Sequence, residues 1–173
     1  VFPLSDIQLR GAHNVLNVLA ASVLADSIGI PHEAMQKAVR LFKGVEHRLE
    51  LVRTLDGVDY INDSIATAPE RALAALHAFD EPLILLAGGQ DKKMVWETWA
   101  SEASQRCKQI ILFGELAEML AEKLAGQANV TRVETMEEAV NAGRETAVSG
   151  DIILLSPGGT SFAAFKDFAQ RGK

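Results

Sequence analysis

The sequence lacks most of the features that would place a protein outside the cell or in a membrane. Cys107 is the only cysteine among 173 residues, so no disulfide can form within the chain, and we expect a reducing, cytoplasmic environment. No apolar run approaches the roughly 18 residues needed to cross a bilayer, and no charged segment followed by an apolar stretch marks a signal peptide. We therefore expect no membrane partner.

Signals for a metal centre and for nucleic-acid binding are also missing. No histidines and cysteines share the spacing of a zinc site, so we expect no metal ligands. The chain carries 17 Lys and Arg against 23 Asp and Glu, a formal charge of −6, which argues weakly against nucleic acid as the main partner. A local basic site for phosphate stays possible. The remaining composition, 48% hydrophobic and 23% charged, is that of an ordinary globular protein, which we expect to be a monomer.

Two regions follow from the hydrophobic pattern. Residues 12–28 and 32–42 repeat apolar residues at helical spacing, which predicts a helical pair over residues 1–43. Residues 44–173 alternate strand-like and helix-like segments, which predicts an α/β domain with a mostly parallel, Rossmann-like sheet flanked by helices. The predicted strands are 49–54, 58–62, 82–89, 109–113, 130–134 and 151–156. The predicted helices are 69–78, one containing Trp96 and Trp99, 115–126, 136–148 with Thr135 as its cap, and 161–172.

The first predicted strand differs from the others. Asp56-Gly57 is a strong two-residue hairpin signal, and a hairpin makes its two strands antiparallel. The prediction is therefore five parallel strands and one antiparallel edge strand.

Ligands of open α/β sheets bind beyond the carboxyl ends of the parallel strands. Three segments at such positions are rich in glycine, hydroxyl groups or charge: "NDSIAT", "GGQDKK" and "SPGGTS". In the last of these, Gly158 and Gly159 would let a ligand approach closely, and the amides of Thr160, Ser161 and Phe162 would open a helix that suits a phosphate or carboxylate. The alternative is a tight strand–helix turn with Ser161 as a simple N-cap.

The other two segments leave similar alternatives. Lys92 could neutralise a carboxylate or phosphate, or belong to a solvated loop. Thr67 precedes Pro69 and could cap the helix or donate to a substrate carboxylate. Asp63 and Ser64 have no structural role in this interpretation, so Asp63 could hold a ribose hydroxyl or a cation, unless the loop satisfies itself through local turns.

Further candidates lie near the boundary and in the first helix. Arg48 is placed where clefts form between domains, or is a surface residue. Asn17, three residues after Asn14 on an apolar stripe, is either hydrogen-bonded in a core or contacts a ligand.

Taken together, these segments identify a family resemblance. The order and spacing of "GAHNVLNVLAA", "EHRLE", "NDSIATAPE", "LLAGGQDKK" and "LLSPGGTSFAAFKDFAQRG" closely resemble the Mur ligases, and in particular the branch that adds D-glutamate to UDP-N-acetylmuramoyl-L-alanine in peptidoglycan synthesis. The resemblance covers essentially the whole chain but only the last third or so of a family member.

The resemblance implies an ATP-dependent amide ligase that uses Mg²⁺, and assigns roles to the motif positions. Residues 1–43 would be the helical end of the central ATP-binding domain, and 44–173 the C-terminal, amino-acid-binding domain. The nucleotide would be contacted by Asn14, Asn17, Arg48 and Asp63. The D-glutamate pocket would be formed by Thr67, Lys92, Ser161, Phe162 and Phe168.

Two departures accompany the resemblance. Many family members have lysine at the position of Ile65, and the chain contains no G-x-x-x-x-G-K-[ST] phosphate loop. We therefore expect no catalysis by this chain alone. The alternatives are a Mur or folylpolyglutamate synthetase-like ligase for another amino acid, and a non-catalytic Rossmann-like binding module.

Overall fold

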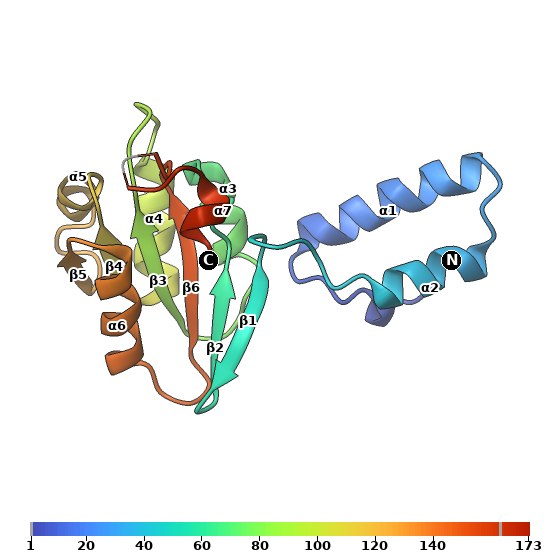
Figure 1. The fold of residues 1–173 in the computed structure, drawn as a ribbon, viewed down its shortest axis with the longest axis horizontal. Coiled ribbons are helices and arrows are strands. Elements are labelled where there is room, and N and C mark those ends of the chain that lie inside the picture. Colours follow the sequence, from blue (N-terminus) through green and yellow to red (C-terminus); the bar gives the residue numbers. More distant parts are fainter. Residues whose placement is uncertain (1, 163) are drawn as a thin grey trace. The chain divides into compact units, whose positions relative to one another are not determined.

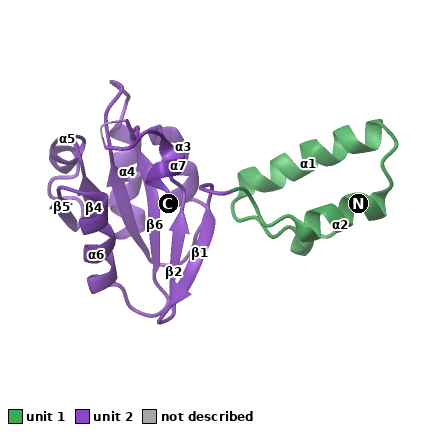
Figure 2. Cartoon of the chain, viewed as in Figure 1, with its two compact units in different colours: residues 1–45 green, residues 46–173 purple. Residues whose placement is uncertain are grey.

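The structure, a computed structural model, describes residues 2–162 and 164–173. The chain divides into two compact units, the first ending at Val45 and the second covering Glu46–Lys173 (Figure 2). This division lies two residues beyond the predicted boundary.

The first unit is a pair of helices preceded by a short 3-10 turn, η1 (Leu4–Asp6). Helix α1 (Ala12–Ser27) ends before Gly29, whose φ of +81° lies in the left-handed region that favours glycine. Helix α2 (His32–Leu41) follows, and Arg40 and Gln36 from this helix bind the Asp6 carboxylate. The predicted helical pair is therefore present.

The second unit contains a six-stranded sheet with the strand order β1-β2-β6-β3-β4-β5 (Figure 1). β1 pairs antiparallel with β2, and all other pairs are parallel, which confirms the predicted five-plus-one arrangement. The strands are β1 (Glu50–Leu55), β2 (Val58–Asn62), β3 (Leu83–Gly88), β4 (Cys107–Phe113), β5 (Val130–Val133) and β6 (Ile152–Gly158). The helices are α3 (Pro69–Leu76), α4 (Glu97–Arg106), α5 (Ala117–Lys123), α6 (Met136–Thr146) and α7 (Phe168–Arg171).

Alternate residues of the central strands supply two apolar cores. Leu85 of β3 packs toward α3, α4 and α5, whereas its neighbours Ile84 and Leu86 pack toward α6 on the opposite face. The sequence of β3 is a continuous apolar run because both of its faces are covered. All six of its residues are buried.

One helix start was predicted correctly from local sequence. The Thr135 hydroxyl accepts from the Glu138 amide at 3.1 Å, while the Glu138 carboxylate accepts from the Thr135 amide. This capping box confirms Thr135 as the N-cap of α6.

The predicted helix over residues 161–172 is wrong. Only Phe168–Arg171 is helical, and among the described residues of 159–167 the chain forms turns and bends. Asp167 caps this short helix by accepting from the Gln170 amide at 2.8 Å, and the Gln170 side chain accepts from the Lys166 amide at 2.6 Å. These caps start the helix at its third phenylalanine, so no helix N-terminus forms at Ser161.

Among the described residues, no helix is both long and apolar enough to cross a membrane.

Candidate functional site

The loops after β2, β6 and β3 are neighbours at the carboxyl ends of the parallel strands, because these three strands are adjacent in the sheet. We call this end of the sheet its carboxyl edge. Backbone hydrogen bonds join the loops directly. The Gly158 amide donates to the Ala66 carbonyl at 2.9 Å, and Gln90 and Thr160 exchange two backbone bonds of 3.0 and 2.9 Å. The structure thus brings together the segments that carry Thr67, Lys92 and Ser161. We call residues 63–68, 89–95 and 159–167 the central loops.

A buried guanidinium links two of the central loops. Arg171 is 1% exposed, and its Nε and Nη2 atoms donate to the Ser64 hydroxyl at 3.0 Å and the Ser64 carbonyl at 2.8 Å. Its Nη1 atom donates to the Gly159 carbonyl at 3.0 Å. Among the described residues no carboxylate pairs with it, and burial lowers the pKa of Arg171 to about 10, so it stays charged at neutral pH. Sequence reasoning assigned no role to this arginine, although it lies at the end of the quoted segment "LLSPGGTSFAAFKDFAQRG".

Asp63 and Ser64 have structural roles, contrary to the prediction that they had none. Asp63 is 5% exposed and accepts from the Leu49 amide at 3.3 Å and the Ser156 hydroxyl at 2.9 Å. The Ser64 hydroxyl donates to the Phe168 carbonyl at 2.8 Å while accepting from Arg171. These residues therefore tie the loop after β2 to β6 and to the C-terminal helix.

The same burial makes Asp63 electrostatically unusual. Burial raises the pKa of Asp63 to about 6, opposed by the hydrogen bonds from Ser156 and Leu49 and by the nearby charges of Arg48 and Arg71. At neutral pH the carboxylate is mostly ionised, and each of its oxygens already accepts one hydrogen bond. Arg48 itself is exposed, beside the turn that precedes β1.

Thr67 does not cap α3, so the first of the two possibilities raised for it is wrong. The N-cap position is Ala68, and no side chain caps this helix. Pro69 occupies the first turn as predicted, where its missing N–H costs nothing. The half-buried Thr67 hydroxyl makes no hydrogen bond within the described chain and is free to donate to a ligand.

The glycines of "SPGGTS" make room for the protein's own groups. Gly158 has a φ of +68°, and a Cβ there would lie 2.9 Å from the Trp96 ring. A Cβ on Gly159 would lie 2.4 Å from Leu116 and 2.7 Å from the Gly88 carbonyl oxygen. The sequence predicted that a ligand approaches closely at these glycines. In the structure, groups from the protein's own loops occupy that space.

Lys92 lies on an exposed turn that is held by hydrogen bonds to the Asp91 side chain. Its ammonium nitrogen is 5.7 Å from the centre of the Phe162 ring, within the range of a cation–π contact. Burial raises the pKa of Asp91, but the hydrogen bonds from the Trp96 indole and from the amides of Met94, Lys93 and Lys92 outweigh it, and the pKa is lowered overall. The turn therefore holds the Asp91 carboxylate in a fixed position next to Lys92 in the chain.

Phe168 contacts the segment before β1. Its ring meets the His47 ring edge-on at 6.1 Å between centres. His47 is 3.0 Å from the Asn62 amide nitrogen, and its φ of +64° is rare for a residue other than glycine. The strained "EHRLE" turn, in which Leu49 also has a positive φ, is therefore fastened to both β2 and the C-terminal helix.

The two candidate asparagines belong to the first unit. Asn14 is buried and donates to the Arg10 carbonyl at 2.8 Å, and the exposed Asn17 donates to the Asn14 side chain at 3.3 Å. Asn14 thus has a structural partner, and Asn17 keeps its carbonyl oxygen available.

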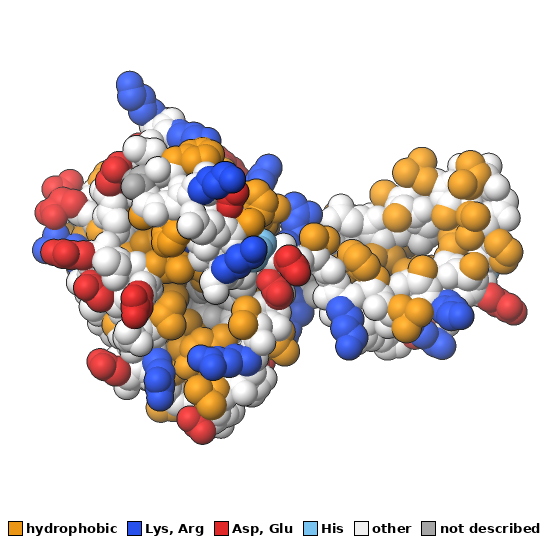
Figure 3. Space-filling model, viewed as in Figure 1, with side chains coloured by type: hydrophobic (Ala, Val, Ile, Leu, Met, Phe, Trp, Pro, Cys, Tyr) orange, Lys and Arg blue, Asp and Glu red, His pale blue; other side chains and the backbone are white. Residues whose placement is uncertain are grey.

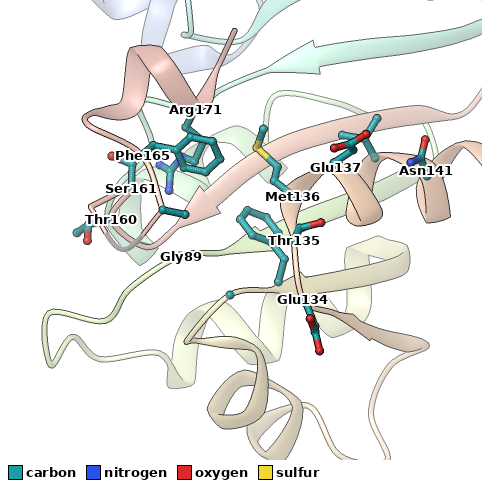
Figure 4. Close-up of a pocket in the computed structure, with 14 residues that line it drawn as sticks. Gly89, Glu134, Thr135, Met136, Glu137, Asn141, Thr160, Ser161, Phe165 and Arg171 are labelled. Carbon is teal, nitrogen blue, oxygen red and sulfur yellow. The ribbon is translucent and has the colours of Figure 1, made fainter.

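A cavity of about 560 Å³ lies beside the central loops, toward β4 and β5 (Figure 4). Phe165, Ser161 and Arg171 stand on one side of it, and Met136 and Thr135 from the start of α6 on the other. Ser161 is the one candidate substrate residue that lines it. Thr67, Lys92, Phe162 and Phe168 are not among the residues that line this cavity.

A second hollow of about 340 Å³ lies on the α6 face of the sheet, over β1, β2 and β6. Figure 3 shows apolar side chains gathered on this face of the second unit. None of the candidate site residues lines it. In the described part of the chain no three His, Cys, Asp or Glu side chains are grouped as metal ligands.

Comparison with known proteins shows the family to which the chain is related. Residues 47–159 match the family model described as "Mur ligase, glutamate ligase domain". The UDP-N-acetylmuramoylalanine–D-glutamate ligase of Roseiflexus sp. is 44% identical over 97% of this chain, and that of Clostridium perfringens is 45% identical over 96%. The chain spans only 37–38% of the length of these relatives.

Solved structures show the same fold at lower sequence identity. The UDP-N-acetylmuramate-alanine ligase of Thermotoga maritima superposes with a TM-score of 0.73 at 20% identity, covering 88% of this chain and 36% of its own. The folylpolyglutamate synthase of the same organism gives 0.63 at 18% identity, covering 88% and 37%. By its family match, the chain belongs to the Mur ligases and contains their glutamate ligase domain.

Proposed function

We propose that this chain is the C-terminal part of an ATP-dependent ligase that joins D-glutamate to UDP-N-acetylmuramoyl-L-alanine in peptidoglycan synthesis. One observation carries the proposal: relatives named for this activity align with nearly the whole chain at 40–45% identity. The position of the candidate residues on three adjacent loops supports it.

The reaction class sets the task of these loops. A free carboxylate reacts poorly with an amine, so the substrate carboxylate is first phosphorylated, and MgATP becomes ADP. The D-glutamate amine then attacks the acyl carbon, the C–O bond to phosphate breaks, the nitrogen loses a proton, and an amide and phosphate form. Holding the amine close to the acyl carbon can contribute roughly 7–11 kcal/mol to lowering the barrier.

We assign the two carboxylates of D-glutamate to the central loops. Lys92 supplies a positive charge, Thr67 an unpaired hydroxyl, and Ser161, which lines the cavity, a hydroxyl with no hydrogen bond to the rest of the described chain. The aromatic rings of Phe162 and Phe168 would cover the carbon chain. Lys92 and Phe162 are exposed, so we expect these side chains to move onto the ligand while the loop backbones stay in place.

The nucleotide roles are proposed for Asn14, Asn17, Arg48 and Asp63. Asn17 would contact adenine with its free carbonyl oxygen, and Arg48 and Asp63 would contact the phosphate and ribose side. Both Asp63 oxygens already accept hydrogen bonds, which favours a contact to a hydroxyl over direct binding of Mg²⁺. We therefore propose that Mg²⁺ enters with the ATP phosphates and is held by groups outside the described residues.

Residues 1–43 would be the helical end of the ATP-binding domain and residues 44–173 the amino-acid-binding domain. The proposed enzyme is a cytoplasmic monomer without nucleic-acid or membrane partners. The lack of a phosphate loop in the chain supports the proposal that it is inactive without the rest of the ligase.

The direct test is phosphate release by the full-length protein supplied with ATP, Mg²⁺ and UDP-N-acetylmuramoyl-L-alanine. We expect release that depends on D-glutamate and not on L-alanine, meso-diaminopimelate or folate substrates. Release with one of those alone would favour a ligase for another amino acid, and no release at all would favour a binding module. Lys92→Met should raise the KM for D-glutamate, and Lys93→Met, on the same turn, should not.

A further inference from the structure

Residues 90–96 form the turn that carries Lys92, here called the Lys92 turn. It is closed by a side chain from within the same loop. One oxygen of Asp91 accepts both from the Met94 amide and from the Trp96 indole nitrogen, each at 3.2 Å. Between them Lys93 has a φ of +59°, in the left-handed region that is uncommon for a lysine. The turn is thus held in one particular conformation by a charge-assisted indole–carboxylate bond.

Trp96 is itself fixed against the end of β6. It is 1% exposed, and its ring packs on Gly158 so closely that a Cβ there would be 2.9 Å away. Its ring also meets Trp99 edge-on, with 5.3 Å between centres. The indole therefore joins the Lys92 turn to the strand that leads to Ser161.

The other end of the turn is attached to the same segment. Gln90 pairs with Thr160 through two backbone hydrogen bonds. The Lys92 turn is consequently held at both ends, at residue 90 by the backbone and at residue 96 by a side chain.

We propose that Asp91 and Trp96 are positioning residues that hold the Lys92 turn against β6 and thereby set the affinity for the amino-acid substrate. This rests on the proposed function, because it takes Lys92 as the cation that meets a D-glutamate carboxylate. A flexible lysine on a loose turn must be ordered when the ligand binds, whereas a turn already held in place avoids that cost.

The structure provides a matched pair of variants to test the proposal. Trp96→Phe removes the indole N–H bonded to Asp91 and keeps most of the ring packing. Trp99→Phe removes an indole N–H that is equally buried but has no acceptor within the described chain. In the full-length ligase we expect Trp96→Phe to raise the KM for D-glutamate by about tenfold, as for the loss of one hydrogen bond to a charged group, and Trp99→Phe by less than about twofold.

Two further readouts separate positioning from loss of stability. Trp96→Phe should leave the KM for ATP and the thermal unfolding temperature close to those of Trp99→Phe. Asp91→Asn keeps an oxygen in the accepting position, so its KM for D-glutamate should fall between those of the wild type and Asp91→Ala. Equal KM increases for Trp96→Phe and Trp99→Phe would overturn the proposal.

An NMR experiment on the 173-residue chain tests the contact without any activity. The chain has only two tryptophans, so its ¹H–¹⁵N spectrum contains two indole signals, which the two Phe variants assign. Asp91→Ala should move the Trp96 indole signal and leave the Trp99 signal in place. An unmoved Trp96 signal would show that the contact is absent and would overturn the proposal.

The two kinds of failure can be told apart. If wild-type full-length protein releases no phosphate with D-glutamate, the proposed function fails and the affinity part of this inference fails with it. The indole signals would still decide whether Asp91 and Trp96 hold the turn.

Discussion

The central loops and the loops after β4 and β5 lie at the same edge of the sheet but are held in different ways. The central loops are cross-linked by buried side chains whose partners are far away in sequence, such as Arg171 with Ser64 and Ser156 with Asp63. The loops after β4 and β5 are closed by backbone bonds, such as that from Gly114 to the Glu134 carbonyl, and by a local helix cap.

This contrast separates a preorganised region from an adaptable one. The buried hydrogen bonds of Arg171, Ser64 and Asp63 specify one arrangement, because breaking any of them leaves an unsatisfied polar group. Such rigidity is what a small, doubly charged substrate requires of its binding loops. Among the described residues, the loops after β4 and β5 lack such cross-links, and the 560 Å³ cavity lies between them and the central loops.

The largest effect should come from removing the guanidinium that joins the central loops. Arg171→Met leaves three buried acceptor sites on Ser64 and Gly159 without donors, at about 1–3 kcal/mol each, partly offset by relief of the buried charge. We expect a loss of about 4 kcal/mol in the free energy of unfolding, measured by urea denaturation.

Arg106 provides the control for that measurement. It also donates to two backbone carbonyls, those of Leu76 and Phe79, but it is exposed. Arg106→Met should cost about 1 kcal/mol or less. Equal losses for the two variants would show that burial does not distinguish the central loops.

The next effect concerns Gly89, where the central loops meet the loop after β4. Gly89 has a φ of +108°, and a Cβ there would lie 2.3 Å from the Thr160 carbonyl oxygen. Gly89→Ala should destabilise by about 3 kcal/mol, combining backbone strain with displacement of the Gln90–Thr160 pair. Gly126→Ala is the control, since Gly126 has a φ of +73° with nothing within 4 Å. Its cost should be about 1 kcal/mol, and the difference between the variants measures the clash.

A third test concerns the charge inside the central loops. Because burial raises the pKa of Asp63 from 3.8 to about 6, the native state keeps a proton that the unfolded state has released between these values. Stability contributed by this group therefore falls as pH rises from about 4 to 6, by up to about 3 kcal/mol at neutral pH.

Asp63→Asn should remove that pH dependence. We expect the variant to be about 2 kcal/mol more stable than the wild type at pH 7, with the advantage disappearing near pH 4, as measured by urea unfolding across this range. Full-length enzyme carrying Asp63→Asn should show a raised KM for ATP, because the carboxylate is proposed to contact the nucleotide. Parallel pH–stability curves for the two proteins would contradict the burial effect.

Local sequence patterns predict only some of the features of this molecule. The succession of strands and helices along the chain and the Thr135 cap depend on periodicity and on neighbours three residues apart, so both were predictable. The bonds of Arg171 reach Ser64 and Gly159, and no local pattern encodes contacts across 107 and 12 residues.

The incorrect last helix has the same origin. The phenylalanine spacing after Ser161 indicated a helix, but local caps at Asp167 and Gln170 favour a later start, and the Thr160 backbone pairs with Gln90 of the neighbouring loop. Tertiary partners satisfied the backbone that a helix would otherwise have satisfied. The candidate substrate residues came from the family motifs, and their shared position on adjacent loops followed from the parallel strand order.

The smallest effect should come from the loops after β4 and β5. Thr135→Ala removes one side of the capping box on α6 and should cost about 1 kcal/mol. Because this cap is local and exposed, the loss should stay in the stability of α6, leaving the KM for D-glutamate unchanged in the full-length enzyme. Thr146→Ala, at the other end of the same helix, serves as the comparison, because it removes hydroxyl bonds to Gln109 of β4 and to the Ala142 and Gly143 carbonyls. A rise in the D-glutamate KM with Thr135→Ala alone would mean that the two halves of the sheet edge are coupled, and that the cavity between α6 and Ser161 takes part in substrate binding.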